Sequence, residues 1–195
     1  NDTSGNGTAG NPWRTIQYAI GQVSANDTIM VAAGLYKENV VIDKSLTLKG
    51  AQAGVDARTR SGPETIIEPS AGIGISIRTA DGRVVVIDGL TVQNAEHGMG
   101  TPDAVMAANI TIKNVRVLNS AQFGISPTFT LRTTVEYCYV QGAKQAINAG
   151  ALDPFPPTVA TFRNNKVVNA EFGFTGYLKD SLIEGNLVTN FAKGG

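Results

Sequence analysis

The chain repeats one short pattern five times: GLTVQN (residues 89–94), NVRVLN (114–119), YCYVQG (137–142), NNKVVN (164–169) and GNLVTN (185–190). The copies recur every 21 to 27 residues, and a valine stands two positions before the last residue of each. These valines are Val92, Val117, Val140, Val167 and Val188. Further apolar columns precede and follow each copy, so one repeat holds three short apolar runs. A unit of this size cannot bury its apolar residues alone, and neighbouring copies must stack.

The short runs have the composition of strands. They alternate apolar and polar residues and are rich in Val, Ile and Thr, which suits half-buried strands. Gly, Asn, Asp and Pro separate them and supply the left-handed backbone conformation that sharp corners need. Stacked copies would pair each strand in parallel with its equivalent on the next coil. The sequence therefore predicts an all-β parallel β-helix over residues 28–195, and the corner asparagines Asn94, Asn119, Asn169 and Asn190 predict an amide ladder.

A short helix is predicted at the start of the stack. Within Thr15–Val23, the apolar residues Ile16, Ala19, Ile20 and Val23 lie at positions i, i+3, i+4 and i+7, which makes one apolar stripe. A helix laid over the first coil would cover the open apolar end of the stack. We therefore expect a single domain over 1–195, with a polar turn and capping helix over 1–24.

The composition excludes several classes of partner. Lys plus Arg and Asp plus Glu number 16 each, so the net charge of zero gives no electrostatic footprint for nucleic acid. No apolar run approaches the roughly 18 residues that a membrane span needs, so no membrane insertion is expected. Low charge and 22 glycines suit a secreted or cell-surface protein. The single cysteine, Cys138, is predicted to be a buried, inert thiol. Gly194 and Gly195 fall in mid-coil without a second cap, which predicts either a truncated β-helix or a neighbouring domain or subunit at that end.

Residues 12–50, PWRTIQYAIGQVSANDTIMVAAGLYKENVVIDKSLTLKG, carry a family resemblance. This run resembles the opening of the pectin lyase-like, right-handed parallel β-helix proteins, including pectin methylesterases and bacterial surface β-helix domains. The shared features are the helix followed by V-A-A-G-x-Y-x-E-N-V and L-T-L-x-G. The resemblance implies a right-handed coil and polysaccharide bound across the face of the first strand of each coil.

The candidate site is predicted on that first-strand face. One outward position after each first-strand apolar residue is charged in every coil: Lys49, Glu68, Asp88, Lys113, Glu136, Arg163 and Glu184. Opposite charges on neighbouring strands would favour register as an ion ladder. Glu68 and Asp88, however, are two acids in succession and are the candidate catalytic pair; we expect them side by side in solvent, about 5 Å apart, with one pKa raised. The remaining predicted ligand contacts are Lys49, Lys113, Glu136, Arg163 and, in a proline-rich loop, Phe155.

Other motifs for catalysis or metal binding are weak. The pectin methylesterase signatures Gln-Asp-Thr-Leu and Gly-Phe-x-x-x-Asp are absent, and Gln145-Ala-Ile only echoes their Gln-Ala-Val. His97 is the single histidine and is predicted to be a solvated corner residue. No metal site is predicted, and acidic residues near the N-terminus allow Ca²⁺ without a specific motif. Two functions stay open: non-catalytic binding of polysaccharide, which the missing signatures favour, and a polysaccharide esterase, lyase or hydrolase using the charged face.

Overall fold

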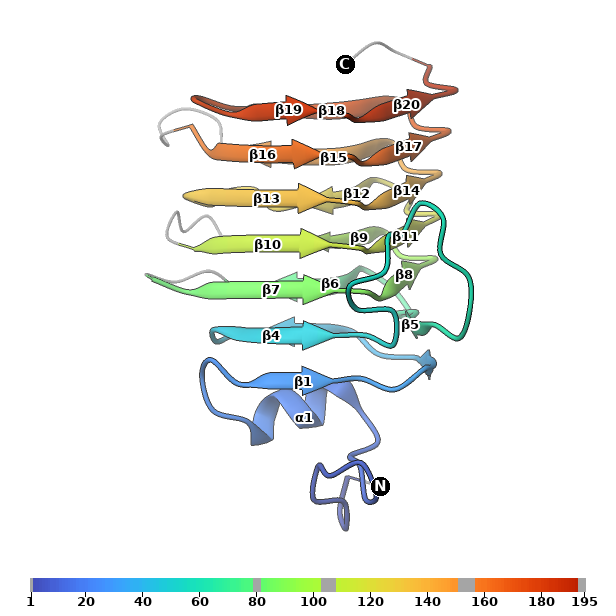
Figure 1. The fold of residues 1–195 in the computed structure, drawn as a ribbon, viewed down its shortest axis with the longest axis vertical. Coiled ribbons are helices and arrows are strands. Elements are labelled where there is room, and N and C mark those ends of the chain that lie inside the picture. The colour runs from blue at the N-terminus through green and yellow to red at the C-terminus, as the bar shows by residue number, and fades with distance from the viewer. Residues whose placement is uncertain (1, 79–81, 103–107, 151–156, 193–195) are drawn as a thin grey trace.

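The computed structural model describes residues 2–78, 82–102, 108–150 and 157–192. Three parallel sheets run along the length of the molecule (Figure 1). Each complete coil adds one strand to each sheet, and the last described coil adds strands to sheets 1 and 2 alone. Sheet 1 contains β1 (Thr28–Met30), β4 (Leu46–Lys49), β7 (Val84–Asp88), β10 (Asn109–Lys113), β13 (Arg132–Glu136), β16 (Val159–Arg163) and β19 (Leu182–Glu184). Sheet 2 contains β2 (Gly34–Tyr36), β5 (Thr65–Ile67), β8 (Thr91–Gln93), β11 (Arg116–Leu118), β14 (Tyr139–Gln141), β17 (Lys166–Val168) and β20 (Leu187–Thr189). Sheet 3 contains β3 (Val40–Ile42), β6 (Ile73–Ile77), β9 (His97–Gly100), β12 (Phe123–Ser126), β15 (Gln145–Gly150) and β18 (Phe172–Tyr177).

The core consists of apolar columns that point into the coil from all three sheets. The predicted valine column is confirmed: its five members pair strand to strand in register, and all but Val188, which is partly buried, are fully buried. Inward and outward residues alternate because successive side chains of a strand point to opposite faces. The predicted parallel β-helix with a short N-terminal helix is therefore confirmed.

Left-handed residues form the corner between sheets 2 and 3. Asn94, Asn119, Asn169 and Asn190 have φ values between 54° and 56°, and Gly142 has φ of 71°. The predicted amide ladder is shorter than expected: in the described residues its one bond runs from Asn119 Nδ2 to Asn94 Oδ1, at 3.4 Å. Gly142 has no side-chain amide and interrupts the ladder. The asparagines therefore serve mainly through their backbone conformation.

Helix α1 (Ile16–Gln22) covers the N-terminal end of the stack, as predicted (Figure 1). Its Ile16, Ala19 and Ile20 are buried against the first coil. The Glu38 carboxylate accepts hydrogen bonds from the backbone N–H groups of Ile16 and Gln17, both at 2.9 Å, and so caps the helix. The side-chain amide of Gln17 pairs with the backbone N–H and C=O of Val41 in β3. This amide covers polar backbone groups that the end strand of sheet 3 would otherwise leave unpaired.

Residues 51–64, which we call the strap, connect β4 to β5 and lie along the outside of sheet 2 (Figure 1). The later loops connect sheet 3 to sheet 1, whereas the strap connects sheet 1 to sheet 2. Arg60 fastens the strap: its guanidinium donates to Glu64 and to the carbonyl oxygens of Leu90 and Asn114.

The C-terminal end of the stack presents apolar residues to solvent. Phe162 and Ile183 are neighbours in one inward column, yet Phe162 is 0 % exposed and Ile183 is 55 % exposed. Leu187 and Phe191 are also exposed there. The domain or subunit predicted to contact this end stays a prediction, as does the assignment of 1–195 to one domain.

Candidate functional site

The predicted charged column lies on the outer face of sheet 1, with one correction. Six of its seven members stack in register: Lys49, Asp88, Lys113, Glu136, Arg163 and Glu184. Two neighbouring pairs form ion pairs, Lys113 Nζ with Asp88 Oδ2 at 3.7 Å and Arg163 Nε with Glu184 Oε1 at 2.9 Å. The second contact is a charge contact without the angle of a hydrogen bond. These pairs are what an ion ladder requires.

The predicted pairing of Glu68 with Asp88 is wrong. Lys49 is the direct neighbour of Asp88 in sheet 1, and Glu68 follows β5 in sheet 2. There Glu68 accepts hydrogen bonds from the side-chain amides of Gln93 and Asn94. These bonds lower the pKa of the Glu68 carboxyl, whereas the predicted acid pair required one raised pKa. The physical reason for the error is local: Thr65-Ile-Ile-Glu68 alternates like a first strand, and the 14-residue strap between β4 and β5 makes β5 resemble the start of a new coil.

Asp88 has a structural role, because it joins the strap to sheet 1. Its side chain is buried, whereas the prediction placed it in solvent. Its side chain is 5 % exposed. Its Oδ1 accepts hydrogen bonds from the backbone N–H of Gly54 in the strap, at 3.0 Å, and from Asn114 Nδ2, at 2.8 Å. With Lys113 beside it, the carboxylate is surrounded by donors on both sides. The catalytic role predicted for Glu68 and Asp88 has lost its geometric basis, and Phe155 lies outside the described residues.

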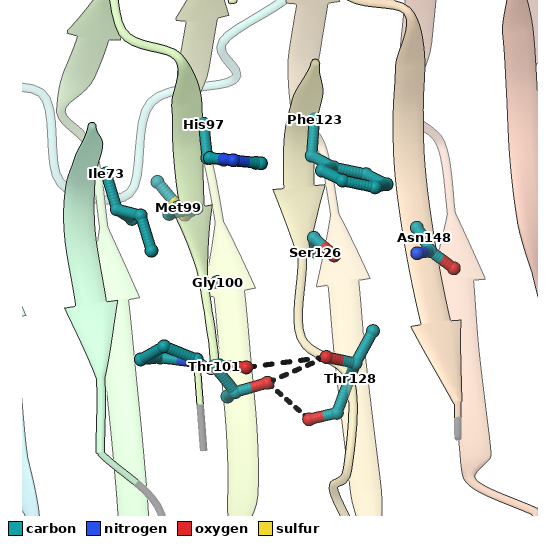
Figure 2. Close-up of a pocket in the computed structure, with 10 residues that line it drawn as sticks. Ile73, His97, Met99, Gly100, Thr101, Phe123, Ser126, Thr128 and Asn148 are labelled. Carbon is teal, nitrogen blue, oxygen red and sulfur yellow. Dashed lines mark hydrogen bonds between the residues drawn. The ribbon is translucent and has the colours of Figure 1, made fainter. Parts of the chain in front are cut away.

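A groove lies instead on the outer face of sheet 3. Its volume is about 310 Å³, and strands β6, β9, β12 and β15 form its floor (Figure 2). The described residues that line it are Ile73, His97, Met99, Gly100, Thr101, Pro102, Phe123, Ser126, Thr128 and Asn148. Gly100 lies in register between Ser76 and Ser126 and has no side chain to fill the floor.

One wall of the groove is part of an outward column of sheet 3, whose members after Ile73 carry planar side-chain groups. Ile73, His97, Phe123, Gln145 and Phe172 occupy the same outward position on five successive strands. The His97 and Phe123 rings stack with centroids 5.2 Å apart and planes 14° apart, and Figure 2 shows them side by side. This geometry lies within the range of favourable aromatic pairs. His97 is therefore a strand residue in a ring stack, and its prediction as a corner residue is wrong.

Small polar groups line the rest of the groove. Ser126 and Asn148 project from β12 and β15 three residues after the planar column. Within the described part of the chain, neither the Ser126 hydroxyl nor the Asn148 side-chain amide has a hydrogen-bond partner. Thr101 and Thr128 close one end, where the Thr101 hydroxyl bonds to the carbonyl and hydroxyl of Thr128. The groove thus offers an apolar planar wall and unpaired polar groups close to it.

The sequence held a signal for this site that the prediction missed. The planar residue stands two positions before each inward apolar residue, as in His97-Gly-Met99, Phe123-Gly-Ile125 and Phe172-Gly-Phe174. The glycine between them is needed for packing: a Cβ on Gly124 would lie 2.5 Å from Ala146 O and 2.6 Å from Val140 Cγ1.

The family model for the right-handed β-helix region matches residues 64–195, which is more than half of the chain. This chain belongs to the right-handed β-helix family. The match agrees with the pectin lyase-like fold that the N-terminal resemblance implied. No curated protein and no solved structure matches this β-helix significantly.

In the described ranges, no group of three His, Cys, Asp or Glu side chains could hold a metal ion. None of the helices among those residues is long and apolar enough to cross a membrane.

Proposed function

We propose that this β-helix binds a polysaccharide in the groove of sheet 3, as a secreted or cell-surface protein, without catalysing its breakdown. The observation that carries the proposal is the stacked ring pair of His97 and Phe123 beside Ser126 and Asn148, whose polar side-chain groups have no hydrogen-bond partner among the described residues. A sugar ring has an apolar face that suits an aromatic wall and a rim of hydroxyl groups that suits hydroxyl and amide partners. Ligand sites combine apolar lining with a few placed polar groups in this way.

Because the coils repeat along the stack, a bound polysaccharide would lie parallel to the long axis of the β-helix. Neighbouring strands of a sheet lie about 4.8 Å apart, so the planar column offers a new contact at each coil. A linear polysaccharide lying along the stack would meet His97, Phe123, Gln145 and Phe172 in succession. This arrangement favours an extended chain of sugars over a single small molecule.

Binding is favoured over catalysis by the positions of the acids. The two acids predicted to act as a pair lie in different sheets, and Asp88 is held by structural hydrogen bonds. The described residues that line the groove include no carboxylate for general acid–base chemistry. The secreted or cell-surface location rests on composition: low charge, with 22 glycines.

The experiment is a glycan array run with the unaltered protein and two variants. Phe123→Leu keeps an apolar side chain and removes the ring, whereas Phe191→Leu makes the same change at an exposed residue far along the chain. We expect Phe123→Leu to weaken binding about tenfold, in the range measured for ring stacking plus lost contact area, and Phe191→Leu to leave it unchanged. Equal binding by all three proteins would refute the proposal that the groove of sheet 3 is the binding site. A parallel turnover screen on polygalacturonate and alginate tests the enzyme alternative, and products released by the unaltered protein would establish it.

A further inference from the structure

A second hollow lies on the outer face of sheet 2, beside the strap. Its volume is about 390 Å³, and its described lining consists of Arg58, Arg116, Leu118, Tyr139, Gln141 and Lys166. Arg116, Tyr139 and Lys166 occupy the same outward position on β11, β14 and β17, so a phenol ring lies between two cations. The Lys166 Nζ lies 5.8 Å from the centre of the Tyr139 ring. This hollow is on a different sheet from the groove and shares no residue with it.

The cations of the strap are mostly paired. Arg58 Nη2 lies 2.6 Å from Asp56 Oδ2, and further hydrogen bonds between the two side chains lower the pKa of Asp56. The Arg60 guanidinium donates hydrogen bonds to both carboxylate oxygens of Glu64, each at 2.8 Å. These two carboxylates are therefore used within the strap itself.

The cations of sheet 2, Arg116 and Lys166, have no carboxylate of their own among the described residues. Arg116 Nη1 reaches only the already occupied Glu64 carboxylate, at 3.5 Å, and its other nitrogens donate to carbonyl oxygens of the strap. No carboxylate of the described residues lies within 4.0 Å of Lys166 Nζ. Three cations, Arg58, Arg116 and Lys166, thus line this hollow, and its described lining includes no carboxylate, in a chain whose net charge is zero.

The neutral polar groups around the hollow add a donor. The Tyr139 hydroxyl donates to Gln141 Oε1 at 2.6 Å, which fixes the orientation of that amide. The Gln141 Nε2 group has no acceptor in the part of the chain that the structure describes. Among the described residues, Lys166 Nζ and Gln141 Nε2 therefore offer N–H groups without an acceptor, and Arg116 Nη1 has only the long 3.5 Å contact with Glu64. An oxyanion is the ligand that accepts several such bonds at once.

We propose that this hollow binds an oxyanion: a sulfate, phosphate or carboxylate group. The group could be a free anion or a substituent on a polymer, because the donors recognise the oxygens in both cases. The proposal does not depend on the groove of sheet 3, and either site can fail without the other.

The test measures binding of sodium sulfate, dextran sulfate and uncharged dextran by calorimetry at constant ionic strength. Lys166→Met keeps an apolar stem over Tyr139 and removes the charge, Lys166→Arg restores a cation, and Lys144→Met removes one charge from an exposed lysine outside the hollow. A charge-assisted hydrogen bond contributes about 1.5 to 3 kcal/mol, so we expect Lys166→Met to weaken binding about tenfold or more. Lys166→Arg and Lys144→Met should remain within about twofold of the unaltered protein.

Each outcome decides the proposal. Loss of both sulfate and dextran sulfate binding in Lys166→Met establishes a site for a free oxyanion. Loss of dextran sulfate binding alone establishes a site for a polymer-borne group. Absence of binding to any charged probe, or equal losses in Lys166→Met and Lys144→Met, would overturn the proposal, because the effect would then be general charge attraction. Unchanged thermal midpoints confirm that the variants are folded.

Discussion

The strap is fastened by one buried guanidinium, and Arg60→Met should destabilise the whole stack. The Arg60 side chain is 0 % exposed and the Glu64 side chain is 14 % exposed. Without Arg60, the Glu64 carboxylate keeps only the Thr91 hydroxyl at 3.0 Å and Arg116 at 3.5 Å. Removing one partner of a buried ion pair costs about 3 to 5 kcal/mol. Because Thr91 and Arg116 remain, we expect a loss near the lower end, about 3 kcal/mol in the free energy of unfolding.

A second variant separates the cost of losing the ion pair from the cost of leaving the Glu64 carboxylate without a partner. Arg60→Met with Glu64→Leu removes both charges, so no buried carboxylate is left without its partner. We expect this double variant to be about 1 to 2 kcal/mol more stable than Arg60→Met, since most of the cost lies in the unpaired group. Arg58→Met is the control on the same strap: its ion pair is about 30 % exposed, and losing it should cost less than about 1 kcal/mol.

Urea unfolding followed by circular dichroism measures these differences by linear extrapolation. A loss below about 1 kcal/mol for Arg60→Met would refute the idea that its guanidinium fastens the strap. A double variant less stable than Arg60→Met would refute the account of the buried carboxylate.

Three further predictions concern the core, the thiol and the lid. Val140→Asp buries a carboxylate without a partner in the inward column and should cost several kcal/mol, seen as a lower urea midpoint; a midpoint within error of the parent would contradict the column. Burial raises the pKa of Cys138 from 9.0 to about 12, so the unfolded chain releases this proton first and stability should fall as pH rises from 9 toward 12. Cys138→Val should lack that part of the fall, and identical pH profiles would contradict it. Glu38→Ala removes the acceptor of the first two N–H groups of α1, while the N-cap Thr15 remains, and should cost about 1 kcal/mol, with faster amide exchange at Ile16 and Gln17. Unchanged exchange would contradict this role of Glu38.

The sequence was sufficient for the coil because the coil is built from local, repeated chemistry. A valine in the inward column of every repeat and left-handed residues at the corners, mostly Asn or Gly, leave few other ways to bury the apolar columns. The capping helix was predictable for the same reason, since its apolar stripe needs only local spacing. Cys138 was correctly predicted as buried because it falls on an inward column.

The candidate site was predicted poorly because it depends on which strands share a sheet. The strap inserts 14 residues inside one coil, between β4 and β5. Because of this insertion, the prediction assigned Glu68 to the charged column of sheet 1, whereas it lies in sheet 2. The same outward alternation that favoured the charged column also holds for His97 and Phe123. Only the register of sheet 3 shows that these rings stack beside Ser126 and Asn148.

The central claim, that the groove of sheet 3 binds polysaccharide, is tested most directly by an NMR titration with an oligosaccharide of the glycan that binds on the array. We expect saturable chemical-shift changes at His97, Phe123, Ser126 and Asn148, with the oligosaccharide intact at the end of the titration. Shift changes confined to the charged column of sheet 1, around Asp88, or an oligosaccharide cleaved or deesterified during the experiment, would contradict it.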